Sequence, residues 1–281
     1  MTGAVTADET GVTVTRHRGV GRAVSDGLVI GWRNLKRIPR LPDALIFATI
    51  QPIMFVLLFA YVFGGAIPLP GGASYREFLM AGIFAQTMAF AVASTSVGMV
   101  DDMNKGLIDR FRSFPMARSA VISGRVVGDI ALNSFVLAVM LACGLVVGWR
   151  WHAGLPRALA AVALLLLFAF AMLWVGAVIG LSVRSTEVAS SAGLIWLFPV
   201  TFLSNAFVPP PTLPDWLKPV VEWNPLSSVV AACRELFGNP NPFTGTGFPA
   251  RQPVLTALIW IVVIIGVFVP LAVRKYQRVT S

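Results

Sequence analysis

Few side chains in this sequence are suited to catalysis or to metal binding. The 281 residues include two histidines, His17 and His152, and two cysteines, Cys143 and Cys233, all far apart in the chain. Residues scattered in this way form no Cys- or His-based metal site, and we expect both thiols to be free. No stretch matches the phosphate loop G-x-x-x-x-G-K-[ST], the nucleophile motif G-x-S-x-G or the zinc motif H-E-x-x-H. We therefore expect a protein that is not an enzyme and that binds neither a metal nor a cofactor itself.

The charged residues with the most informative spacing lie in the segment DDMNKGLIDRFRSFPMARSAVISGR, which starts at Asp101. Met103, Leu107 and Phe111 recur at helical spacing on one face, and charged side chains mark the opposite face. Pro115 would end this helix. A short charged helix between two membrane spans is suited to docking a cytoplasmic partner, whose motion would then reach both spans. The alternative is an ordinary basic loop on the cytoplasmic side.

Arg125 and Asp129 form the second arrangement of charges. They are four residues apart, so they can pair along one face of a helix. A charged side chain costs a few kcal/mol at the centre of a bilayer, and less near its surface. Since the pair lies near the cytoplasmic start of a predicted span, we expect a structural ion pair. The alternative is a contact that takes part in coupling or gating.

The elements that position these residues are predicted to be membrane spans. The chain is 56% hydrophobic and 12% charged, whereas soluble domains carry about 25% charged residues. Crossing the hydrocarbon layer takes roughly 20 apolar residues. Six runs are long enough: 44–63, 78–100, 126–147, 158–183, 188–207 and 254–273. In the fourth of these spans, Gly176 and Gly180 permit close approach of another helix, which we expect to belong to the same subunit.

The distribution of Lys and Arg predicts the orientation. With both termini in the cytoplasm, sixteen of the 22 basic residues lie in cytoplasmic segments and six in external ones. This asymmetry follows the positive-inside rule. We expect a multi-pass protein of the inner (plasma) membrane with both termini cytoplasmic. The net charge of +9 is then explained by basic flanks that face anionic lipids, so membrane lipids are expected partners and nucleic acid is not.

Three segments lie outside the expected spans. Residues 1–19 are small and polar, which predicts a disordered cytoplasmic tail. Residues 20–40 predict an amphipathic interfacial helix, with apolar residues on one face and basic residues on the other. The alternative is a helix packed on another subunit. The proline-rich region 208–238, with Trp216 and Trp223, predicts short re-entrant helices at the outer leaflet, and a structured external loop is the alternative.

Three stretches carry a resemblance to a known family. They are RNLKRIPRLPDALIFATIQPIMFVLLFAYVFGG, DDMNKGLIDRFRSFPMARSAVISGR and, most specifically, FPVTFLSNAFVPPPTLPDWLKPVVEWNPLSSVVAACRELFGN. Together they cover roughly a third of the chain. The sequence resembles the membrane permease subunit of type-2 ABC exporters, in particular the daunorubicin/doxorubicin resistance permease group of actinobacteria.

The resemblance implies an all-α membrane fold for residues 41–281, with six transmembrane helices, the interfacial helix and the re-entrant helices near the outer exit. It implies a second permease subunit, as a homodimer, and two copies of a cytoplasmic ABC ATPase that binds ATP and magnesium. ATP binding would close the ATPase pair and turn the permease from inward-open to outward-open.

The loop 101–118 would be the coupling helix. The residues that we expect to contact the ATPase are Asp102, Lys105, Gly106, Asp109, Arg110 and Phe111.

The expected substrate path follows the second and fifth spans, because aromatic faces and an amide suit a flat polycyclic molecule. The alternative is that these aromatic rings pack against lipid or neighbouring spans. The expected function is export of a hydrophobic or amphipathic drug or antibiotic, and the alternative is export of a cell-envelope lipid or glycolipid. An ion-coupled secondary transporter is less favoured, because acids are scarce inside the spans. The expected path residues are Phe90, Thr95, Phe198, Phe202 and Asn205.

Overall fold

The computed structural model describes residues 42–63, 74–105, 118–207, 214–241 and 247–279 of the chain. Every regular element within these ranges is a helix, so the predicted all-α class holds there. The predicted tail over 1–19 and interfacial helix over 20–40 lie outside them. The helices are α2 (Pro42–Leu58), the π-helix η2 (Phe59–Phe63), α3 (Tyr75–Asn104), α5 (Arg118–Val147), α6 (Leu155–Gly180), α7 (Thr186–Leu194), α8 (Leu197–Phe202), α9 (Lys218–Glu222), α10 (Pro225–Phe237), α11 (Phe248–Arg251) and α12 (Pro253–Val279).

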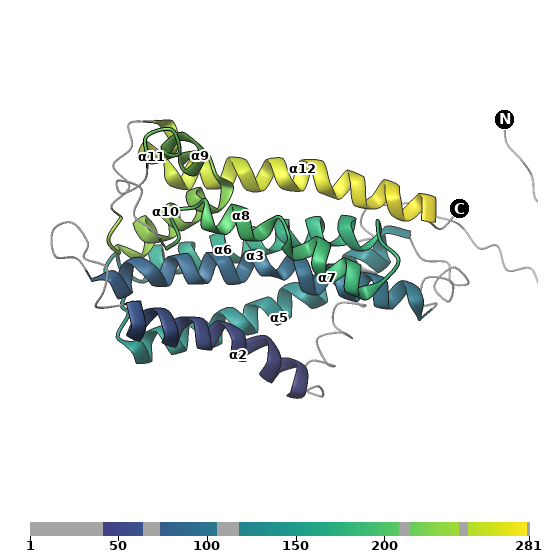
Figure 1. Cartoon of the computed structure of the whole chain (residues 1–281), viewed down its shortest axis with the longest axis horizontal. Coiled ribbons are helices and arrows are strands. Elements are labelled where there is room, and N and C mark those ends of the chain that lie inside the picture. Colours follow the sequence, from purple (N-terminus) through teal and green to yellow (C-terminus); the bar gives the residue numbers. More distant parts are fainter. Residues whose placement is uncertain (1–41, 64–73, 106–117, 208–213, 242–246, 280–281) are drawn as a thin grey trace, which may run out of the picture.

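Four of the described helices are long and apolar enough to cross a membrane, over Tyr75–Asn104, Gly124–Val147, Leu155–Gly180 and Pro253–Arg278. They are α3, α5, α6 and α12, which run lengthwise along the molecule (Figure 1). The first expected span corresponds to α2, which η2 continues as a short π-helix. The protein is therefore membrane-embedded, with four of the six expected spans formed as single long α-helices.

The fifth expected span, over 188–207, is not confirmed as one continuous helix. The structure divides it into α7 and α8. Ser185 caps the start of α7, where its hydroxyl oxygen accepts a hydrogen bond of 3.2 Å from the backbone N–H of Val188. Pro199 has no backbone N–H and cannot donate to the carbonyl of Ile195, which favours a break between the two helices.

The least and the most apolar of the long helices are buried in the opposite sense to that of a water-soluble bundle. In α3, the least apolar of the four, 78% of the spanning window is buried inside the protein. In α12, the most apolar, only 17% is buried. Leu255, Val262 and Val263 are among its large exposed side chains. Because lipid tails are as apolar as these side chains, this placement of α3 inside and α12 outside is stable in a bilayer.

Helices α3 and α6 pack closely, because two glycines of α6 face the backbone of α3. A Cβ atom at Gly176 would lie 2.6 Å from the carbonyl oxygen of Val92, and one at Gly180 would lie 2.6 Å from that of Ser96. The Ser96 hydroxyl donates to the carbonyl of Gly176 across this contact, at 3.1 Å. The predicted close approach at these glycines is confirmed, and its partner belongs to the same subunit.

The short helices α9, α10 and α11 gather at the end of the molecule opposite the C-terminal end of α12 (Figure 1). Local sequence sets the limits of α10. The Asn224 side chain accepts a hydrogen bond of 2.8 Å from the N–H of Leu226, Pro225 is the first helical residue, and Gly238 ends the helix with φ of 72°. Helix α10 packs against α3, α6 and α12. The region predicted to be re-entrant therefore contains two short helices, and its place in a membrane stays a prediction.

Replacing Gly176 by valine is expected to lower the melting temperature of the detergent-purified protein by several degrees. The added side chain would push α3 and α6 apart, at a cost of about 2–3 kcal/mol. Gly266→Val in α12 is the matched control, because no described atom other than those of its chain neighbours and its own helix backbone lies within 4 Å of a Cβ at that position. Equal losses in the two variants would contradict the close packing of α3 on α6.

Candidate functional site

A network of charged and polar side chains joins the end of α3 to the start of α5. Arg125 donates from Nη1 to Oδ2 of Asp102, and its Nε lies 3.5 Å from Oδ2 of Asp129. The Thr95 hydroxyl donates to the same Asp129 oxygen at 2.8 Å. The Arg125–Asp129 pair that the sequence predicts is present, as one part of a four-residue network that crosses between two helices.

Packing leaves this network little freedom. The Arg125 side chain is 22% exposed and that of Asp129 is 19% exposed, so neither charge is fully solvated. A Cβ atom at position 98 of α3 would lie 1.6 Å from Nη2 of Arg125, so Gly98 leaves the space that the guanidinium fills. Because partly buried charges need their partners, α3 and α5 are held together at this end.

The predicted docking residues lie in and beyond the end of α3. Asp102 belongs to the charged network, and Lys105 pairs with Asp101 at 2.5 Å on the surface. Their role in contacting a partner stays a prediction. The other four predicted docking residues, Gly106, Asp109, Arg110 and Phe111, lie outside the described residues.

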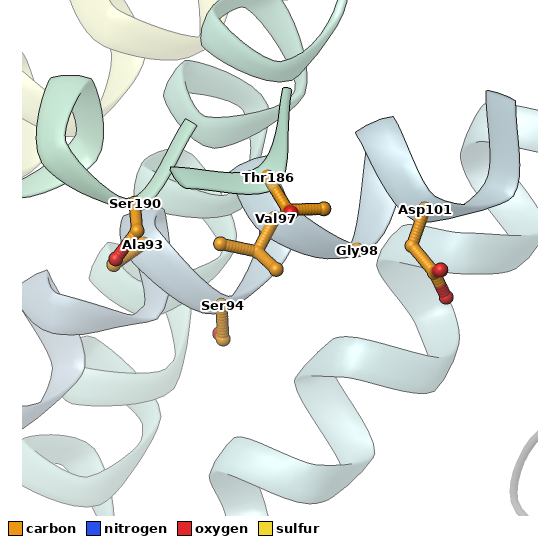
Figure 2. A pocket seen from close by; sticks show the side chains of 7 residues that line it. All are labelled: Ala93, Ser94, Val97, Gly98, Asp101, Thr186 and Ser190. Atoms are coloured by element: carbon orange, nitrogen blue, oxygen red, sulfur yellow. The ribbon is translucent and has the colours of Figure 1, made fainter. Parts of the chain in front are cut away.

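An open hollow of about 620 Å³ lies between α3 and α7. Figure 2 shows that the α3 residues follow one another along the helix, with Asp101 farthest from Ser190 of α7. The hollow has a mostly apolar lining, with hydroxyl groups and the Asp101 carboxylate as its polar groups. It is lined by Ala93, Ser94, Val97, Gly98, Asp101, Thr186 and Ser190.

A second cavity, of about 290 Å³, adjoins the first and is lined by residues of α2, α3, α5, α7 and α8. The two share Ala93 and Ser94 on α3. Two of the predicted path residues, Phe90 and Phe198, line this second cavity, with their ring centroids 6.2 Å apart. Together the hollow and the cavity extend along the same side of α3, from Asp101 in the hollow to Phe90 in the cavity.

The other three predicted path residues do not line either space. Phe202 stacks on Phe198 with ring centroids 6.5 Å apart and is 69% exposed. Thr95 is fully buried in the charged network, and Asn205 is fully buried between α8 and α10. The structure thus brings Phe90 and Phe198 together and separates the rest, and the role of all five in transport stays a prediction.

The sequence-based choice of path residues omits most of the side chains that line the cavity, among them Phe55, Gln86 and Asn133. Gln86 lies four residues before Phe90 and eight before Ser94, so the three share one face of a helix. That spacing could have identified Gln86. Phe55 and Asn133 belong to other helices, and no local spacing connects them to α3.

Arg234 of α10 is a further residue that sequence analysis leaves out. Its side chain is fully buried and donates from Nε to the carbonyl of Phe78 at 2.9 Å. Its Nη2 donates to the carbonyls of Asn205 and Ala206 at 2.9 and 3.2 Å, and the guanidinium lies 3.6 Å from the centre of the Phe78 ring. Burial lowers the pKa of Arg234 to about 9, so it stays charged at neutral pH and fastens α10 to α3 and to residues 205–206.

Comparison with known proteins gives a consistent result. The family model of the ABC-2 type transporter matches residues 27–237. The chain is 32% identical over 256 residues to the daunorubicin resistance ABC transporter permease protein DrrB1 of Streptomyces coeruleorubidus, which covers 91% of this chain and 87% of that protein. It is 26% identical over 239 residues to the doxorubicin resistance ABC transporter permease protein DrrB of Mycobacterium tuberculosis, with 81% and 82% covered.

Replacing Arg125 by methionine is expected to lower the free energy of unfolding by about 2–3 kcal/mol, because it leaves two partly buried carboxylates unpaired beside each other. Lys105→Met is the matched control. It removes an exposed ion pair that contributes at most about 1 kcal/mol. Thermal unfolding in detergent measures both variants, and a loss at Arg125 no larger than that at Lys105 would contradict the structural role of the network.

Proposed function

The chain belongs to the ABC-2 type transporter family, in the group of drug-resistance ABC permeases, and on this premise we propose that it is the transmembrane subunit of an ABC exporter. The exporter moves a hydrophobic or amphipathic drug outward across the plasma membrane. The observation that carries the proposal is the match to a daunorubicin resistance permease over 91% of this chain and 87% of that protein. A match of this extent covers the whole membrane domain of both proteins and not one motif alone.

The energy for transport comes from a separate ATPase. The sequence has no phosphate loop, so ATP and magnesium bind the partner and not this chain. Two permease subunits, as a homodimer, and two ATPase subunits form the working exporter. Both termini lie in the cytoplasm, as the sixteen basic residues of the inner segments support.

The loop over 101–118 is the contact with the ATPase, and the charged network explains how movement there reaches the membrane. Since Arg125 of α5 holds Asp102 of α3, a push on the loop moves the ends of both helices together. Helix α3 also lines the aromatic cavity near Phe90. Closure of the ATPase pair is thereby passed along α3 to the substrate path.

The chemistry of the cavity supports an amphipathic cargo. Phenylalanine rings give it apolar faces, and hydroxyl and amide groups give it places to form hydrogen bonds. Ligand sites for small molecules combine a mostly apolar lining with a few polar groups in this way. The open hollow between α3 and α7 provides a route to this cavity from the end of α3 that carries Asp101.

The function is tested by coexpression with the ATPase from the same source and by ATP-dependent uptake of daunorubicin into inverted membrane vesicles. We expect the ATPase to copurify with the tagged permease. Phe111→Ala should lower uptake on the order of tenfold, since losing one apolar anchor of an interface costs at least about 1.4 kcal/mol.

Asp215→Asn is the control for this experiment, because Asp215 is exposed and, among the described residues, pairs with Lys218 alone, at 2.6 Å. Its uptake should equal that of the wild type. Failure to copurify an ATPase would contradict the ABC exporter assignment. An ATPase that is stimulated by envelope lipids and not by daunorubicin would replace the drug with a lipid cargo.

A further inference from the structure

The cavity beside Phe90 contains hydrogen-bonding groups that the fold does not use. Gln86 is 6% exposed and lines the cavity, yet its amide forms no hydrogen bond with any residue in the described part of the chain. Asn133 is 7% exposed. Its amide nitrogen donates to the carbonyl of Asp129 at 2.8 Å, while its amide oxygen has no partner among the described residues.

The hydroxyl groups of the same cavity behave differently. Thr87 donates to the carbonyl of Ile83 at 2.8 Å, and Ser94 donates to that of Ala91 at 3.0 Å. Each hydroxyl is thus satisfied by its own helix. The Gln86 amide is accessible at the cavity wall and has no partner among the described residues, so it is free to donate to and accept from a ligand.

The aromatic lining indicates the shape of that ligand. Phe55, Phe90 and Phe198 come from α2, α3 and α8, respectively, and surround the same space as Gln86. Ring faces favour offset or edge contacts with another aromatic ring. None of the described residues that line the cavity is ionisable, so an anionic group such as a phosphate would be buried there without a counter-charge.

We propose that this cavity is a recognition site for a flat aromatic molecule that bears carbonyl or hydroxyl groups, and that Gln86 sets selectivity by hydrogen bonding to them. The inference rests on the proposed function and adds where the cargo binds and which of its groups are recognised. At about 290 Å³ the cavity holds the ring system alone. Polar substituents extend past Ser94 into the adjoining hollow of about 620 Å³ (Figure 2).

The test uses daunorubicin as the probe, because it combines fused aromatic rings with carbonyl and hydroxyl groups. Its affinity for the purified full-length protein is measured by fluorescence anisotropy. Gln86→Met keeps the length of the side chain and removes the amide. We expect the Kd for daunorubicin to rise about tenfold, and the Kd for diphenylhexatriene, an aromatic hydrocarbon that forms no hydrogen bonds, to stay unchanged.

Ser134→Ala is the control for binding. Ser134 follows Asn133 in α5 but does not line the cavity, and its hydroxyl donates to the carbonyl of Ile130 at 2.8 Å. Its Kd for daunorubicin should equal that of the wild type. The melting temperature of Gln86→Met separates binding from folding. It should not fall, because the amide has no partner to lose among the residues that the structure describes.

Two results would overturn the site. One is a Kd for daunorubicin that Gln86→Met leaves unchanged, and the other is an equal weakening of both probes. If ATP-dependent uptake of daunorubicin by the wild type persists in either case, the exporter assignment stands and only this site fails. If the wild type neither binds nor transports daunorubicin, the drug cargo and the site both fail.

Discussion

The structure depends on one constraint, which is that α3 lies inside an apolar bundle while carrying polar side chains along its length. A polar group inside the bundle can be hydrogen-bonded only by another group of the protein or by a bound molecule, because neither lipid nor apolar neighbours offer a partner. The Ser96 hydroxyl donates to the carbonyl of Val92 in its own helix at 2.7 Å and also lies 3.1 Å from that of Gly176, and the Thr95 hydroxyl donates to Asp129. The close approach of α6 and the inward position of Asp129 on α5 are thus both tied to hydroxyl groups of α3.

Because α3 is so placed, it connects three features that lie far apart. At one end it contributes Asp102 to the charged network with α5. Along its middle it lines the aromatic cavity through Gln86 and Phe90. Near its start the carbonyl of Phe78 accepts a hydrogen bond from Arg234 of α10. A displacement at the Asp102 end therefore has a direct mechanical route to the cavity and to the helices at the opposite end.

Sequence reasoning predicts the features that depend on local spacing. The pairing of Arg125 with Asp129 needs only one helical turn, and the close contact at Gly176 needs only the absence of a side chain. Contacts between segments that are far apart in the chain cannot be predicted from residue spacing. Asp102 and Arg125 are 23 residues apart, and Arg234 and Phe78 are 156 apart. The break between α7 and α8 is an intermediate case. Pro199 indicates a break, but the hydropathy of the segment favours one continuous span.

The most direct test of the account is whether cargo occupies the space beside α3. In a Cys143→Ser background, Ser94→Cys places a thiol where the cavity and the hollow meet, and Leu155→Cys places one on a surface position that is 61% exposed. Labelling of the purified protein by N-ethylmaleimide is followed with and without saturating daunorubicin. The account predicts that daunorubicin slows labelling at position 94 several-fold and leaves position 155 unchanged. Equal labelling rates at position 94 with and without the drug would contradict it.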